Sequence, residues 1–125
     1  MKLSAIVLVF VGGGLGSMLR YIISIAARPI TVSFPYATLI ANLIGCFVLG
    51  ALIGFMGAKT ATFSNTYLLF AVGFCGGLTT FSSLTLENMR FIEQGQLFNL
   101  VLYTIFSFAF SLIFLYLGML LHRLF

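Results

Sequence analysis

One segment of this chain reads Gly73-Phe74-Cys75-Gly76-Gly77-Leu78-Thr79-Thr80-Phe81-Ser82-Ser83 and lies in the middle of a long apolar run. Glycine is a poor helix former, so glycines followed by a cluster of hydroxyl side chains predict a helix that opens here. In hydrocarbon, irregular backbone survives only where it is buried in protein or lines a polar cavity. We therefore expect functional residues at this break.

The composition predicts an integral membrane protein. Of the 125 residues, 62% are hydrophobic and 6% are charged, whereas a soluble domain carries about 25% charged residues. Because a membrane helix needs roughly 20 apolar residues, the length predicts four spans and a single all-α transmembrane domain over the whole chain. The few Lys and Arg residues are too scattered for a nucleic-acid site.

We expect the spans at residues 3–27, 35–58, 65–90 and 97–122, joined by short connections at 30–34, 59–66 and 93–96. Pairs of glycines four apart, Gly12 with Gly16 and Gly50 with Gly54, predict close contacts between helices. Apolar and polar residues do not alternate with a period of two, which argues against a membrane β-barrel.

Polar residues inside the first two spans have two interpretations each. Arg20 either faces a water-filled vestibule or extends toward the membrane surface. Thr38 and Asn42 are four apart and share a helix face. Asn42 either makes a hydrogen bond between helices or lines an ion pathway.

The fourth span carries a line of polar side chains. Tyr103, Ser107 and Ser111 recur every four residues, which places them along one side of a helix over about 12 Å. A single serine in a membrane helix often bonds its own backbone. Three aligned hydroxyl groups indicate a polar track. His122 lies in the last turn, where a cation complements the helix dipole, and is not expected to be functional.

Basic residues near the span ends are divided almost evenly between the two sides of the membrane. One side holds Lys2, Lys59 and Arg123, the other holds Arg28 and Arg90, and Arg20 could lean either way. Such a chain has almost no positive-inside bias and can insert in both orientations. An antiparallel homodimer is therefore physically reasonable, with the two breaks meeting at its centre.

The sequence resembles the Fluc (CrcB) family of small dual-topology fluoride channels. The resemblance touches all four expected spans and rests on residues 13–21, residues 35–45, residues 73–82 with Glu87, and the Tyr103, Ser107 and Ser111 line. It implies an antiparallel homodimer in the inner membrane, with two fluoride pores and a structural Na⁺ on the dimer axis. Backbone carbonyls of Gly76 and Thr79 would hold this ion.

The resemblance also implies an anion pathway. The ring edge of Phe81 would contact the anion, and polar groups would replace its lost water. These residues would be Arg20 at the mouth, then Thr38, Asn42, Ser82, Ser83, Tyr103, Ser107 and Ser111. At residue 84 this chain has leucine where the family pattern has a second phenylalanine.

The function expected from this resemblance is passive export of cytoplasmic fluoride. One alternative is a proton-coupled cation exporter of the small multidrug resistance type, which needs a membrane-embedded carboxylate. Glu87 is the only acidic residue in the expected spans, and we expect it near the end of the third span. Another alternative is a structural subunit whose polar residues only join helices. We find no pairing of a nucleophile with a nearby base in the sequence, so an enzyme is not expected.

Overall fold

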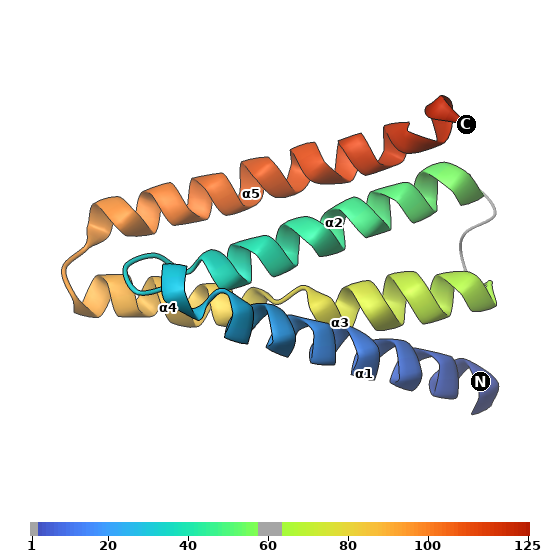
Figure 1. Cartoon of the computed structure of the whole chain (residues 1–125), viewed down its shortest axis with the longest axis horizontal. Helices are drawn as coiled ribbons and strands as arrows, with labels where there is room; N and C mark the ends of the chain where they lie inside the picture. The colour runs from blue at the N-terminus through green and yellow to red at the C-terminus, as the bar shows by residue number, and fades with distance from the viewer. Residues whose placement is uncertain (1–2, 58–63) are drawn as a thin grey trace.

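The computed structural model describes residues 3–57 and 64–125 and is all-helical. Four of its helical segments are long and apolar enough to cross a membrane: Leu3–Ala26, Tyr36–Met56, Tyr67–Glu93 and Leu97–Leu124. These segments confirm the four predicted spans. Figure 1 shows them side by side, with both chain ends at the same end of the bundle. Lys2, Lys59 and most of the expected 59–66 connection lie outside the described residues.

The first span, α1 (Leu3–Ala26), packs against the first part of the third span through glycines. A Cβ atom at Gly12 would lie 2.1 Å from the Leu69 carbonyl oxygen, and one at Gly16 would lie 2.1 Å from that of Phe74. Both distances are far below van der Waals contact, so only glycine allows the two backbones to approach this closely. The predicted contact role of Gly12 and Gly16 is confirmed. A short 3₁₀ helix, η1 (Arg28–Ile30), follows α1.

The second span, α2 (Tyr36–Met56), packs in the same way against α5 (Leu97–Leu120). A Cβ atom at Gly50 would lie 2.0 Å from the Leu115 carbonyl oxygen, and one at Gly118 would lie 2.2 Å from that of Phe47. Glycines from both helices therefore permit this contact. The chain ends with another 3₁₀ turn, η3 (Leu121–Leu124).

The third span is interrupted, as predicted. It consists of the π-helix η2 (Tyr67–Cys75), the short α3 (Gly76–Leu78) and, after an opening, α4 (Phe81–Glu93). Only Thr79 and Thr80 are extended, with ψ angles of 152° and 120°. The break is thus confined to these two threonines.

Within the predicted stretch it is not the glycines that open the helix, since Gly73, Gly76 and Gly77 are all helical. Gly73 and Gly77 serve close packing instead. A Cβ atom at Gly73 would lie 2.9 Å from the Cα of Gly12, and one at Gly77 would lie 2.3 Å from the Gly13 carbonyl oxygen. Gly76 differs, since nothing lies within 4 Å of its Cβ position.

The end of the third span also differs from the expectation. Helix α4 continues to Glu93, and Gly95 reverses the chain with a φ of +68° that glycine adopts readily. Glu87 therefore lies inside α4 rather than near its end. Its carboxylate contacts side chains of two other spans.

Candidate functional site

The opened backbone at Thr80 is held by one side chain of α2. Asn42 Oδ1 accepts a hydrogen bond from Thr80 N at 2.7 Å, and Asn42 Nδ2 donates to Thr80 O at 3.3 Å. An amide carries both a donor and an acceptor, so a single asparagine pairs both backbone groups of one residue. The interpretation of Asn42 as a hydrogen-bonding partner between helices is confirmed, and the asparagine is fixed beside the break.

The hydroxyl groups that follow the break form a cap on α4. Thr80 Oγ1 accepts from Ser83 N at 3.2 Å, as threonine commonly does at the start of a helix. The same oxygen lies 3.1 Å from Ser82 Oγ and 3.2 Å from Ser83 Oγ. Three hydroxyl groups therefore gather at the point where α4 begins.

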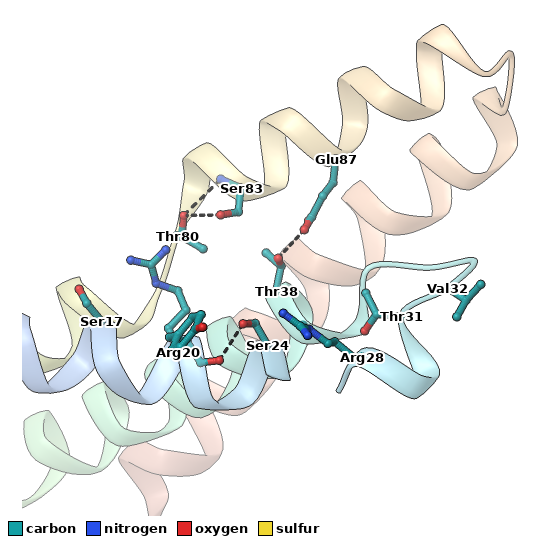
Figure 2. A pocket seen from close by; sticks show the side chains of 12 residues that line it. Ser17, Arg20, Ser24, Arg28, Thr31, Val32, Thr38, Thr80, Ser83 and Glu87 are labelled. Carbon is teal, nitrogen blue, oxygen red and sulfur yellow. Dashed lines mark hydrogen bonds between the residues drawn. The ribbon is translucent and has the colours of Figure 1, made fainter. Parts of the chain in front are cut away.

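An open cavity of about 660 Å³, which we name the vestibule, lies beside this cap. Figure 2 shows Arg20 of α1 on one side of it and Ser83 and Glu87 of α4 on another. Arg20 Nε donates to the carbonyl oxygen of Gly77 at 3.1 Å, which fixes the guanidinium at the end of α3. Arg28 also lines the vestibule. The structure therefore supports the interpretation that Arg20 faces a vestibule, and not the one in which it extends toward the membrane surface.

Glu87 joins three spans at the wall of the vestibule. Thr38 Oγ1 of α2 donates to Glu87 Oε1 at 2.6 Å, and the Tyr103 hydroxyl of α5 donates to Glu87 Oε2 at 2.5 Å. Tyr103 is fully buried, with the rings of Phe34 and Phe91 at 5.3 and 6.0 Å. Both oxygens of the half-buried Glu87 carboxylate are thus hydrogen-bonded.

A second cavity, of about 450 Å³, lies along the other side of the break, and we name it the groove. Its wall includes Asn42, Phe81, Ser107 and Ser111. Phe81 is 80% exposed in the single chain. Ser107 is buried, yet its hydroxyl oxygen has no hydrogen-bond partner among the described residues. The groove therefore combines an exposed ring with an unpaired hydroxyl group.

Comparison with known proteins identifies the family. The family model described as "CrcB-like protein, Camphor Resistance (CrcB)" matches residues 7–119. The chain belongs to the CrcB family. Proteins similar to it include the "Fluoride-specific ion channel FluC" of Prosthecochloris aestuarii, 41% identical over 98% of this chain and 95% of that protein. The protein of the same name from Chlorobium chlorochromatii is 42% identical over 94% of this chain and 91% of its own length.

Membership of the CrcB family, together with the four apolar helices, makes this a multi-pass protein of the inner membrane. Its relatives are named as ion channels, so the family also supports the prediction that the chain is not an enzyme.

In this CrcB protein the candidate residues divide between the two cavities, and Thr80 lines both of them. Arg20, Thr38 and Ser83 line the vestibule. Gly76 and Thr79 line the groove together with the four residues named above. Tyr103 and Ser82 are in neither wall. Tyr103 instead turns to Glu87, because the hydroxyl of a buried tyrosine needs a partner.

Sequence reasoning missed the roles of Thr80 and Glu87. Threonine is a preferred residue at the position just before a helix begins, and this preference could have indicated Thr80. The pairing of Glu87 could not be read from the chain, because its partners are 49 and 16 residues away.

Proposed function

We propose that this protein is a passive channel that exports cytoplasmic fluoride. The observation that carries this proposal is that vestibule and groove lie on either side of Thr80, which lines both, and that their walls present hydrogen-bond donors. The names of its similar relatives support fluoride as the ion. Fluoride is small and strongly hydrated, so donors spaced along the path would have to replace its water.

At the mouth, Arg20 and Arg28 would concentrate anions, because these two positive charges outweigh the one carboxylate, Glu87, in the vestibule wall. The next donors would be the Ser83 hydroxyl and the amide of Asn42. An amide nitrogen carries two hydrogens. One of those on Asn42 is used by Thr80 O, which leaves the other for the anion.

In the groove, the anion would meet the edge of the Phe81 ring, which carries partial positive charge. The unpaired Ser107 hydroxyl and that of Ser111 would offer donors in the same wall. A buried hydroxyl without a partner costs free energy. An anion that accepts its hydrogen would remove this cost, which supports Ser107 as part of the path.

Export needs no coupled energy source under this proposal. Neutral hydrogen fluoride would enter, dissociate inside and leave its anion trapped. A negative-inside potential, worth about 2.3 kcal/mol per charge for each 100 mV, would drive that anion out.

The proposed working unit is an antiparallel homodimer with two pores. An open groove with Phe81 80% exposed is incomplete in a single chain, and a second copy would close it. The proposed central Na⁺ would be held by carbonyl oxygens of Gly76 and Thr79. Carbonyls at the end of a helix lack intrahelical partners and suit a hard cation. Residues 3–57 and 64–125 contain no cluster of His, Cys, Asp or Glu that could hold a metal, so backbone oxygens from two copies fit it best.

The alternative of a proton-coupled cation exporter has a stronger basis than the sequence indicated, because Glu87 lies inside α4 and not at its end. Both of its oxygens, however, already accept hydroxyl hydrogens. Proton-driven uptake of a cationic dye into liposomes would support the exporter. Fluoride efflux without a proton gradient would support the channel.

The decisive experiment measures efflux from fluoride-loaded liposomes with a fluoride electrode, and chloride efflux for comparison. We expect rapid fluoride efflux from the wild type and none from Phe81→Ile. The matched control is Phe98→Ile, since Phe98 is 74% exposed on α5 and lines neither cavity. Absence of wild-type fluoride efflux, or undiminished efflux from Phe81→Ile, would contradict the proposal. Reporters fused to both termini test dual topology, and a single orientation would exclude the antiparallel dimer.

A further inference from the structure

The hydroxyl groups of α5 that line the groove are Thr104, Ser107 and Ser111. Residues three and four apart lie on one side of a helix, so these side chains form a row along the groove. The sequence predicted a row that begins at Tyr103. Because Tyr103 is turned to Glu87, Thr104 takes the first place in the row, and it had no predicted role.

The hydroxyl of Thr104 is held in an unusual way for a membrane helix. Threonine in a helix commonly donates its hydrogen to the carbonyl four residues earlier. Thr79 and Thr85 do so in this chain, at 2.8 Å from Cys75 O and 3.0 Å from Phe81 O. Thr104 Oγ1 instead accepts a hydrogen bond from Asn88 Nδ2 at 3.0 Å.

This arrangement leaves the hydrogen of Thr104 without an acceptor in the part of the chain that the structure describes. A hydroxyl group has one donor hydrogen and two acceptor sites. Asn88 occupies one acceptor site, and the donor stays unused at the wall of the groove. Thr104 is exposed in the single chain, so an anion in the groove could reach it.

The hydrogen bond between Asn88 and Thr104 leaves polar groups of both residues unpaired within the described part of the chain. Its Oδ1 atom is buried and has no hydrogen-bond partner among the described residues. If the Thr104 hydrogen were donated to that oxygen, both groups would be satisfied within the protein. In this structure Asn88 Nδ2 instead donates to Thr104 Oγ1, which occupies one acceptor site of the threonine oxygen and leaves its hydrogen free to rotate toward the groove.

We propose that Thr104 is an anion-binding residue of the groove, with Asn88 as the residue that positions its hydroxyl as a donor. This inference rests on the proposed channel function and adds a donor site to it. Thr104 would contact the anion directly. Asn88 would act only through Thr104.

The test compares fluoride efflux, and the ratio of fluoride to chloride efflux, for Thr104→Val, Thr104→Ser and Asn88→Leu in liposomes. Valine keeps the shape of threonine and removes the hydroxyl group. A hydrogen bond to an ion contributes enough free energy for about a tenfold loss of fluoride efflux in Thr104→Val. Thr104→Ser keeps the donor and should stay close to the wild-type rate. The matched control is Thr85→Val, because the Thr85 hydroxyl is bonded to its own helix and lines neither cavity.

The double variant distinguishes positioning from a separate structural effect. If Asn88 acts through Thr104, then Asn88→Leu should lower the efflux of the wild type and add nothing to Thr104→Val, since coupled residues are not additive. Multiplied losses, or unchanged efflux and halide ratio in Thr104→Val, would overturn the inference while wild-type efflux still supports the channel. Absence of wild-type efflux would overturn both. If Thr104→Val does not fold, the same comparison is made with Thr104→Ala.

Discussion

Gly16→Ala is the substitution for which the structure gives the sharpest expectation. The added Cβ atom would lie 2.1 Å from the carbonyl oxygen of Phe74 and 2.7 Å from the amide nitrogen of Leu78. Both are backbone atoms, so no change of side-chain rotamer can relieve the contact. Helix α1 and the third span would have to move apart.

The size of the effect follows from these distances. Ordinary contact begins at 3.4 Å, so the 2.1 Å approach requires a separation of at least about 1.3 Å, the difference of the two values. Forcing extra atoms into a packed contact typically costs about 1–3 kcal/mol, and the better helix propensity of alanine offsets up to about 1 kcal/mol. We expect a net loss of about 1–2 kcal/mol in the free energy of unfolding.

Gly14→Ala is the matched control, because nothing lies within 4 Å of the Cβ position at Gly14. Both variants can be unfolded with denaturant in the same detergent and followed by far-UV circular dichroism, since the chain contains no tryptophan. Fluoride efflux should fall in Gly16→Ala as well, because Arg20 lies one turn further along α1 and contacts Gly77 O. Equal stability of the two alanine variants would refute the close-packing argument.

The other predictions concern the break and its surroundings. Asn42→Asp should block fluoride efflux, because it places negative charge in the proposed path and removes the amide donors. An unchanged efflux rate would show that the anion does not pass Asn42. Thr80→Ala should lower the free energy of unfolding by about 1 kcal/mol through loss of the helix cap, and denaturant unfolding that matches the wild type would contradict this role. Glu87→Gln should destabilise by about 1–3 kcal/mol, because a carboxylate that accepts two hydroxyl hydrogens is replaced by a group with one acceptor atom. In the same assay the exposed Glu93→Gln should change little, and equal effects of the two would count against the Glu87 pairing.

Much of the fold could be predicted from the sequence because it depends on local patterns. Apolar runs gave the four spans to within a few residues at their described ends, and glycines four apart indicated the close contacts of α1. The position of the break was less well predicted. Glycine has two uses in a membrane helix, to open it or to let another backbone approach, and composition alone does not distinguish them. In this chain Gly73 and Gly77 allow another backbone to approach, whereas the helix opens at Thr79 and Thr80.

The candidate site was predicted in part for a similar reason. Ser107 and Ser111 line one groove, as their spacing indicated, and Asn42 and Phe81 lie in the same wall, as the family resemblance implied. Tyr103 was assigned to the same row because it is four residues before Ser107. A spacing of four fixes direction only to within about 40° per step at 100° per residue, so it could not reveal that Tyr103 turns toward α4 while its neighbour faces the groove.

Close packing at glycines joins the helices into two pairs. The first is α1 with η2 and α3, and the second is α2 with α5. From α2, Asn42 makes side-chain hydrogen bonds to Thr80, and Thr38 makes one to Glu87 of α4, the continuation of the third span. Close backbone packing holds each pair, whereas fewer contacts, several of them polar, join α2 to the third span. A bundle assembled this way is stiff within each half and compliant along the line where the halves meet. Alcohols that compete for hydrogen bonds should therefore separate the halves before they unwind either one.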